Sequence, residues 1–157
     1  NIIKLRGINM DRKIIKTHKA PQTIGPYSQA VKSGNFIFAS GQIPLDPVSG
    51  NMAENDIKKQ TERVMENIKG LLESENLTFA NVIKTTCYLS DMSNFAAFNE
   101  VYGSYFKDNP PARSTVAVKS LPKDALVEVE ITAVLKLLIK PCIIIIHGFL
   151  FLNNFNK

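Results

Sequence analysis

The sequence predicts an α+β fold, a single domain in which two helices cover one face of a six-stranded sheet. Strand-like and helix-like segments follow each other in the order β-β-β-α-β-α-β-β, so that helices interrupt the strands without following each one. The chain has 157 residues, enough to bury one core without disulfides or metals. Its content of 45% hydrophobic and 21% charged residues is typical of a globular protein and not of a disordered one.

Three short strands are predicted before the first helix. Residues 13–17 form an extended segment, and a hairpin follows with strands over residues 27–32 and 35–40. Gly34 lies between these two strands and can supply the positive φ that a tight turn needs. Prolines and glycines between residues 41 and 50 predict a loop.

The spacing of apolar residues predicts two amphipathic helices. From Ile57 to Leu72 the apolar positions recur at helical intervals, with Thr61 on the same side. A second helix over residues 93–106 carries phenylalanines and tyrosines along one side, and Pro110 and Pro111 follow its end. The remaining strands are predicted over residues 82–89, 114–119 and 126–135.

The second face of the predicted sheet has no helix of its own to cover it. Two helices cannot shield both sides of six strands, and an exposed apolar sheet face must be buried against something. Copies of the same chain are the simplest cover, so we expect the protein to be an oligomer.

The two ends of the chain differ in composition from the middle. We interpret residues 1–9 as a leader or added sequence, residues 10–134 as the domain, and residues 135–157 as an atypical hydrophobic C-terminal extension. The extension is rich in isoleucine and phenylalanine, but Lys136, Lys140, Pro141 and His147 interrupt it. An added strand, or a read-through past the end of the domain, is therefore favoured over a membrane span.

Several common kinds of site are disfavoured by the residues present. The sequence has no glycine-rich phosphate loop, no Cys-x-x-Cys and no Gly-x-Ser-x-Gly. His18 and His147 are far apart, so neither a metal site nor a Ser-His triad is expected. The net charge of +5 comes from scattered lysines, which favours a solvated surface over a nucleic-acid interface. Cys87 and Cys142 indicate a reducing compartment, with the cytoplasm as the expected location and an organelle as the alternative.

One arginine and one acidic strand remain as candidates for chemistry. Arg113 follows two prolines, and its planar guanidinium suits bidentate binding of a carboxylate. Strand alternation places Glu128 and Glu130 on one face and the intervening valines on the other, so that this face is a candidate for holding an acid near Arg113. Two interpretations stay open: Arg113 binds the carboxylate of a ligand, or it forms a structural salt bridge with one of the two glutamates.

Five motifs in register provide the strongest indication of function. They are Ile24-Gly25-Pro26-Tyr27-Ser28-Gln29-Ala30, Ala39-Ser40-Gly41-Gln42-Ile43-Pro44, Phe98-Asn99-Glu100-Val101-Tyr102, Pro111-Ala112-Arg113-Ser114, and Leu121-Pro122-Lys123 leading to Val127-Glu128-Val129-Glu130. Together, over residues 13–134, they resemble the RidA family, also called the YjgF family, of reactive-intermediate deaminases. The resemblance implies a mixed sheet like that of chorismate mutase of the bacillar type, in a homotrimer with active sites between subunits.

The resemblance also implies an activity and a set of site residues. The expected reaction is hydrolysis of 2-iminobutanoate and 2-iminopropanoate to 2-keto acids and ammonia, with no cofactor and no metal. Arg113 would bind the substrate carboxylate, and Glu128 would act as general base and then as general acid. The resemblance implies that four further residues line the cleft, namely Tyr27, Ser40, Gly41 and Asn99. Each of these four also has a structural interpretation, as a turn aromatic, a strand end or a helix residue bonded to a loop.

Thr115 departs from the family pattern, because many bacterial members have a cysteine at this position. A thiol-based mechanism there is not expected in this chain. Two other functions are considered. Some relatives have been described as translation inhibitors with ribonuclease activity, and a trimeric ligand-binding or chaperone-like module would use the same clefts without turnover. Against RNA binding, the sequence has no basic stripe with interleaved aromatics.

Overall fold

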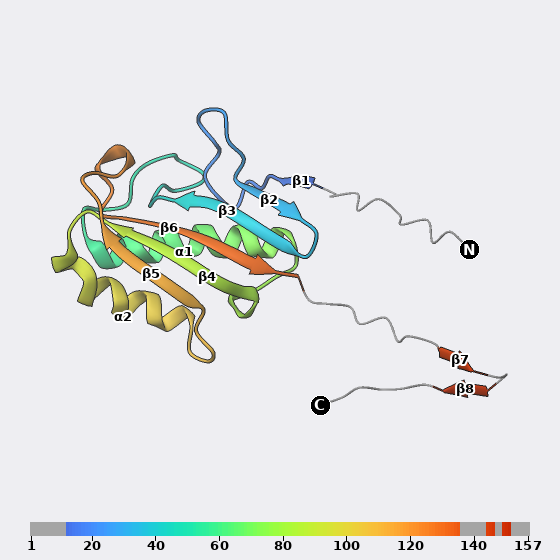
Figure 1. The fold of residues 1–157 in the computed structure, drawn as a ribbon. Helices are drawn as coiled ribbons and strands as arrows, with labels where there is room; N and C mark the ends of the chain where they lie inside the picture. The colour runs from blue at the N-terminus through green and yellow to red at the C-terminus, as the bar shows by residue number, and fades with distance from the viewer. Residues whose placement is uncertain (1–11, 136–143, 147–148, 152–157) are drawn as a thin grey trace.

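The predicted α+β fold is confirmed by the computed structural model, which describes residues 12–135, 144–146 and 149–151 (Figure 1). The strands of the main sheet are β1 (Arg12–Ile15), β2 (Ala30–Ser33), β3 (Phe36–Gln42), β4 (Val82–Leu89), β5 (Ala112–Ala117) and β6 (Val127–Val134). Their order in space is β1-β2-β3-β6-β4-β5. Neighbours are antiparallel except for β4 and β5, so the sheet is mixed. The helices α1 (Ile57–Ser74) and α2 (Phe95–Tyr105) lie on one face of it.

The first predicted helix forms where its apolar pattern begins. The Asp56 side chain accepts a hydrogen bond from the Lys59 backbone N–H at 2.9 Å and so caps the start of α1. Val64, Ile68 and Leu72 are buried on the side that faces the sheet. They belong to the main core cluster, which also includes the inward-facing residues of β6. This packing fixes α1 against the central strands.

Most strand boundaries differ from the prediction by one or two residues, and three differences concern segments that position the site. β2 begins at Ala30 and not at Tyr27, because Gly25 has φ +122° and the Tyr27 N–H bonds to the Gly25 carbonyl, which turns the chain. β5 begins at Ala112, where it starts to pair with Lys84 of β4, so residue 113 lies inside a strand. The segment predicted as one helix over residues 93–106 divides into a 3₁₀ turn, Met92–Asn94, and α2.

The alternation predicted for β6 is confirmed. Val127, Val129, Ile131 and Ala133 are buried toward the helices, and the residues between them face the other side of the sheet. On that open face β3 exposes Phe36 by 44% and Phe38 by 50%, and β1 and β5 expose Ile14 and Val116. Large apolar side chains on a sheet face are the feature that predicted burial against another copy.

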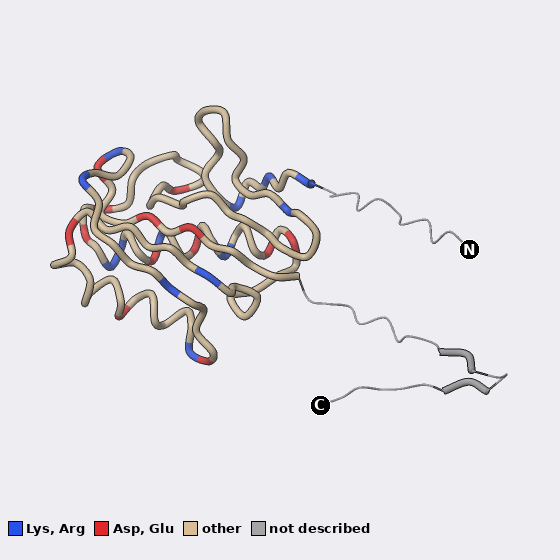
Figure 2. The backbone as a smooth tube through the Cα atoms, viewed as in Figure 1, with Lys and Arg blue, Asp and Glu red and all other residues tan. Residues whose placement is uncertain are grey.

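Basic and acidic residues both occur over most of the described chain. Figure 2 shows Lys and Arg together with Asp and Glu on the helices and the later strands, whereas β1, β2 and the loop between them carry only Lys and Arg. Some of these charged residues form ion pairs, such as Lys13 with Glu75 and Lys19 with Glu73, with 2.9 Å between nitrogen and oxygen in each.

The C-terminal extension contains two short strands, β7 (Ile144–Ile146) and β8 (Phe149–Phe151), which pair with each other as an antiparallel hairpin. The leader predicted over residues 1–9 and most of the extension lie outside the described residues. Among the residues described, no helix has the length and apolar character needed to cross a bilayer.

Candidate functional site

A cavity of about 540 Å³ brings together four of the six predicted site residues. Tyr27, Ser40, Gly41 and Glu128 all line it. Its wall is completed by residues from the loop before β2, from the loop after β3 and from the turn before β6, namely Pro21, Gln22, Thr23, Ile24, Gln29, Gln42, Ile43, Leu45, Pro122 and Lys123. The volume lies in the range of about 300–1,000 Å³ that is usual for small-molecule sites.

A β-bulge at the end of β3 shapes one side of the cavity. Ala39 is opposite Ile131 and Gln42 is opposite Val129, so β3 uses one residue more than β6 between these pairs. Ser40 and Gly41 occupy the bulged stretch. The extra residue bends β3 away from regular pairing and turns these two residues toward the cavity.

Gly41 is required because the Glu128 side chain lies directly against its Cα. A Cβ at position 41 would be 1.8 Å from Glu128 Oε1 and 2.7 Å from its Cδ. Both distances are well below van der Waals contact. The glycine thus provides the space in which the carboxyl group sits, and the φ of Gly41 is an ordinary one. Close approach, and not backbone freedom, explains this glycine.

The environment of Glu128 favours its neutral form more than solvent does. Burial raises the pKa of the Glu128 carboxyl, and the nearby Glu130 carboxylate raises it further. No ion pair with a Lys or Arg of the described chain offsets these effects. A carboxyl group whose pKa is raised, and which lies in a cavity, is a candidate for taking up and releasing protons during a reaction.

Gln29 fastens the loop that forms the outer wall of the cavity. Its side chain is 3% exposed. The Nε2 group donates to the carbonyls of Thr17, Ala20 and Pro21 at 3.0, 3.1 and 2.8 Å, and Oε1 accepts from the Thr17 N–H at 2.7 Å. These bonds satisfy buried backbone groups and hold the loop against β2. The loop carries Tyr27, a residue that lines the cavity and is 54% exposed.

Ser40 connects the bulge to the same loop. Its hydroxyl donates to the Ser28 carbonyl at 2.7 Å, and its backbone N–H donates to the Gln29 carbonyl at 3.0 Å. The side chain therefore has a structural bond, and only the remaining lone pairs of its oxygen can accept from a ligand.

Arg113 lies elsewhere, on the edge strand β5, with its guanidinium on aromatic rings of α2. Its Cζ is 4.8 Å from the ring centroid of Tyr102, 5.6 Å from that of Phe95 and 5.9 Å from that of Phe98. The Tyr102 hydroxyl shares a hydrogen bond of 2.9 Å with the buried Thr85 hydroxyl. The rings thus hold the guanidinium by cation–π contacts and leave its N–H groups available to a ligand.

Asn99 belongs with Arg113 and not with the cavity. It is an exposed residue of α2, four positions after Phe95 and three before Tyr102, so it lies on the same flank of the helix as these two rings. The six predicted residues therefore form two groups. One surrounds the cavity with Glu128, and the other surrounds the guanidinium.

The two groups lie on opposite faces of the sheet in one chain. Arg113 is paired with Thr85, whose side chain faces the helices, whereas Glu128 is paired with Tyr88 on the open face. The expectation that the acidic face of β6 would hold an acid near Arg113 is thus wrong within a single chain. The described residues also contain no salt bridge between this arginine and Glu128 or Glu130. The structural salt bridge that the sequence left open is not formed.

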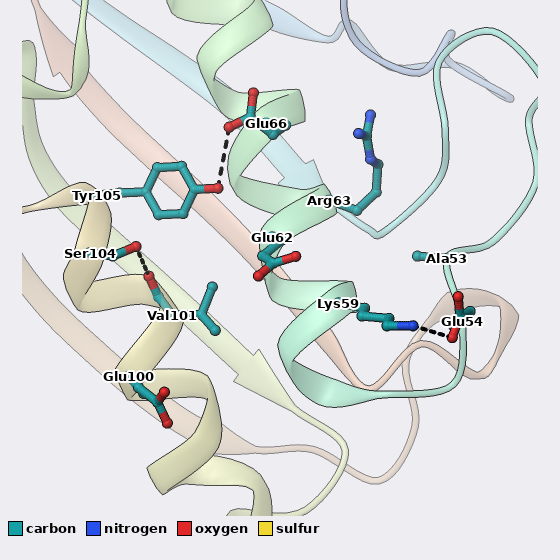
Figure 3. Close-up of a pocket in the computed structure, with 10 residues that line it drawn as sticks. All are labelled: Ala53, Glu54, Lys59, Glu62, Arg63, Glu66, Glu100, Val101, Ser104 and Tyr105. Carbon is teal, nitrogen blue, oxygen red and sulfur yellow. Dashed lines mark hydrogen bonds and ion pairs between the residues drawn. The ribbon is translucent and has the colours of Figure 1, made fainter.

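A larger cavity, of about 810 Å³, contains none of the predicted residues (Figure 3). It is a groove between α1 and α2 with several carboxylates. Glu54, Glu66 and Glu100 are paired with Lys59, Lys69 and Lys58. Burial and the neighbouring Glu66 carboxylate, to which the Tyr105 hydroxyl donates at 3.2 Å, raise the pKa of Tyr105 to about 12. Since these charges are paired on the surface, we assign the site to the smaller cavity.

In the part of the chain that the structure describes, neither a reactive cysteine nor a metal site is found. Cys87 is fully buried in the core, and burial raises the pKa of its thiol, so it is a packing residue and not a nucleophile. Within the described ranges, no three His, Cys, Asp or Glu side chains converge as they would around a metal ion. Cys142 and His147 lie outside these ranges.

Three features of the site could not be assigned from sequence. The hydrogen bonds of Gln29 are made to a loop that lies up to twelve residues away in the chain. The aromatic rings beneath Arg113 are placed there by the packing of α2 on β5. Lys123 lines the cavity because of the turn before β6. Gln29 and Lys123 do occur in the motifs, so the motifs include these two positions but do not indicate what the side chains do.

The chain is similar to known proteins over most of its length. Residues 17–135 match the family model described as Endoribonuclease L-PSP. A RutC family protein of Pyrococcus abyssi is 53% identical over 124 residues, which cover 79% of this chain and 98% of that protein. Two E. coli structures, of the YjgF gene product and of TdcF with bound serine, are 40% and 41% identical. Each has a TM-score of 0.75 and covers 78% of this chain and 98% of its own. This likeness supports the fold that the motifs implied.

Proposed function

This chain belongs to the Endoribonuclease L-PSP family, also known as the RidA or YjgF family, and on that basis we propose that it hydrolyses 2-imino acids to 2-keto acids and ammonia. The observation that carries the proposal is the Glu128 carboxyl group, which lies against Gly41 in a cavity and has a raised pKa. A group of this kind suits the proton transfers that imine hydrolysis requires.

The active unit in this proposal is a homotrimer in which each site combines two chains. One chain supplies the cavity with Glu128, Tyr27 and Gly41, and a neighbour supplies Arg113 and Asn99. This arrangement is supported by the placement of the two groups on opposite sheet faces, because a single chain cannot bring them together. Exposed Phe36 and Phe38 on the open face also favour contact with another copy.

Arg113 is the proposed partner of the substrate carboxylate. Its guanidinium is held on three rings and has no acidic partner among the described residues, so its paired N–H donors are ready for a bidentate carboxylate. The bound serine in TdcF shows that a relative binds a molecule with the same α-carboxylate. Binding there would orient the imine carbon toward the neighbouring cavity.

Glu128 is the proposed acid and base. As its carboxylate, it takes a proton from water while the water oxygen bonds to the carbon of the protonated imine (C=NH2⁺) and the C=N electron pair moves to nitrogen. The protonated carboxyl then gives that proton to the NH2 group of the carbinolamine, which becomes NH3⁺. The C–N bond breaks with its electron pair going to nitrogen, ammonia leaves, and the hydroxyl proton passes to Glu128 as the carbonyl forms; Glu128 then releases this proton to solvent. The substrate gains one water and loses one ammonia, so no redox partner is needed.

The direct test is keto acid release from 2-iminobutanoate, generated in situ from threonine by a dehydratase. We expect the wild type to accelerate hydrolysis and expect Arg113→Ala and Glu128→Ala to lose about 100-fold or more in kcat/KM. Both variants should keep the oligomeric mass of the wild type in light scattering. If the wild type leaves the imine untouched and cleaves RNA, the ribonuclease function named in the family description replaces the proposal.

A subunit-mixing experiment tests whether the two groups meet between chains. Arg113→Ala and Glu128→Ala chains are unfolded together in equal amounts and refolded. In a cyclic trimer each mixed assembly regains one intact site, so random mixing should restore about a quarter of wild-type activity. Refolding each variant alone is the control. Complete inactivity of the mixture, with mixed trimers present by mass spectrometry, would contradict the intersubunit site.

A further inference from the structure

The cavity around Glu128 contains a cation that the proposed hydrolysis does not use. Among the residues that line it, Glu128 is the carboxylic acid and Lys123 is the basic residue. Lys123 is exposed, so it lies at the mouth of the cavity. It forms no ion pair with another residue of the described chain. Its ammonium group is therefore available to an anion that enters the cavity.

The turn that carries Lys123 has an unusual backbone. Lys123 has φ 58° and Asp124 has φ 55°, both in the left-handed region. Lysine has no side-chain bond to the local backbone that would favour this conformation, unlike asparagine or aspartate. Such residues persist where the surrounding structure fixes them, and they occur often at binding sites.

Both ends of this turn are anchored in the protein. The Asp124 N–H donates to the Leu121 carbonyl at 3.2 Å, and the Ala125 N–H donates to the Pro122 carbonyl at 3.3 Å. Leu121 and Ala125 are buried, with 8% and 1% exposure. The lysine is therefore presented from a fixed turn and not from a loose loop, which lowers the entropy cost of binding there.

The cavity has room for more than a small imino acid between the lysine and the glutamate. Its volume of about 540 Å³ is far more than the side chain of 2-iminobutanoate fills. Lys123 and Glu128 form no ion pair, so the ammonium and the carboxyl occupy separate positions in it. A substrate with its imine carbon beside Glu128 can extend its side chain toward the mouth.

We propose that Lys123 forms a subsite for a second anionic group, so that the preferred substrates are 2-imino dicarboxylates. The α-carboxylate binds Arg113, and the side-chain carboxylate binds Lys123. The inference rests on the proposed hydrolysis and specifies its substrate class. One cation for each carboxylate would favour a dicarboxylate over an equally long apolar substrate, since neither charge is left unpaired.

The test compares two imines on matched variants. 2-Iminoglutarate is generated in situ by a glutamate oxidase and 2-iminobutanoate by a threonine dehydratase. We expect wild-type kcat/KM to be at least about tenfold higher for the dicarboxylate. Lys123→Gln should lower the ratio of the two values by about 10- to 100-fold, and Lys123→Arg should restore it, because both keep a long side chain in the same turn. Lys69→Gln on α1 removes the same charge away from the cavity and serves as the control.

Two results would overturn the subsite. An equal loss on both imines would mean that Lys123 serves the α-carboxylate or the fold, and an unchanged ratio would mean that it touches neither substrate. If wild type hydrolyses neither imine, the proposed function fails, and calorimetry with 2-oxoglutarate and 2-oxobutanoate tests the subsite directly. Tighter binding of 2-oxoglutarate that Lys123→Gln abolishes supports it, and equal binding of the two refutes it.

Discussion

Replacing Gly41 by alanine should separate activity from stability. The new Cβ would lie 1.8 Å from Glu128 Oε1, whereas ordinary van der Waals contact begins at 3.4 Å. The carboxyl group must therefore retreat by roughly 1.6 Å. Because the obstructing atoms belong to the far end of a flexible, half-buried side chain, the side chain can rotate while the backbone stays in place.

The size of the effect follows from that displacement. A catalytic group misplaced by about 1 Å costs on the order of 100-fold in rate. We therefore expect kcat/KM for 2-iminobutanoate to fall by about 100-fold in Gly41→Ala, close to the loss in Glu128→Ala. The free energy of unfolding should fall by only about 1 kcal/mol, at the low end for an overpacked site, because the carboxyl group can move toward the cavity.

Gly34→Ala is the matched control. Gly34 has φ +57° in the β2–β3 turn, with no atom near a Cβ added there, so alanine should cost about 1 kcal/mol of stability from backbone strain alone. Its activity should remain near that of the wild type. Urea unfolding at one fixed protein concentration and keto acid release are measured on both variants.

Wild-type activity in Gly41→Ala would mean that catalysis does not depend on where the Glu128 carboxyl group lies. A loss of activity in proportion to the loss of stability in both glycine variants would contradict a specific role for the space at Gly41. A double variant, Gly41→Ala with Glu128→Asp, gives a further check. The shorter acid relieves the steric overlap, so the double variant should be more stable than Gly41→Ala alone while staying poorly active.

Three other outcomes are expected. Burial raises the pKa of Glu128 in the folded chain, so the folded state binds more protons than the unfolded state, and the stability contributed by this group falls as the pH rises above the pKa of the unfolded chain. Glu128→Gln should therefore resist urea better than wild type at pH 8. The difference between the two proteins should vanish below about pH 4. Gln29→Leu leaves buried carbonyls without donors and should lower the free energy of unfolding by about 3 kcal/mol in the same urea assay. Tyr102→Phe removes the bond to Thr85 but keeps the ring beneath Arg113, so it should cost about 1 kcal/mol and leave KM unchanged, whereas Tyr102→Leu should also raise KM.

The elements that sequence could predict are those set by local pattern. The helix from Ile57 begins and packs as its apolar spacing indicates, and the alternation around Glu128 sets the faces of β6 correctly. The predicted start of β5 is two residues too late. The prolines before Arg113 are typical of a loop, but the parallel pairing with Lys84 begins immediately after them. Pairing with a strand some thirty residues away leaves no trace in the local composition.

The site divides in the same way. The residues alone indicate an arginine suited to a carboxylate and an acidic strand with Glu128 and Glu130, and the resemblance of the five motifs then singles out Glu128. The placement of Arg113 and Glu128 on opposite faces could not be predicted, because it depends on β5 pairing with β4 in one register and β6 pairing in another. In the structure, Arg113 and Glu128 therefore cannot line one pocket of a single chain.

The opposite placement of Arg113 and Glu128 has a consequence for how such a site stays active. Within one chain, an unpaired guanidinium near an unpaired carboxylate would form a salt bridge, which would lower the pKa of the acid and occupy the arginine. Because the sheet separates the two residues, the Arg113 guanidinium contacts only neutral aromatic rings, and burial together with the Glu130 carboxylate keeps the pKa of Glu128 raised. In the proposed site between two chains, each group would thus keep its reactive state until a substrate with a carboxylate at one end and an imine at the other binds there.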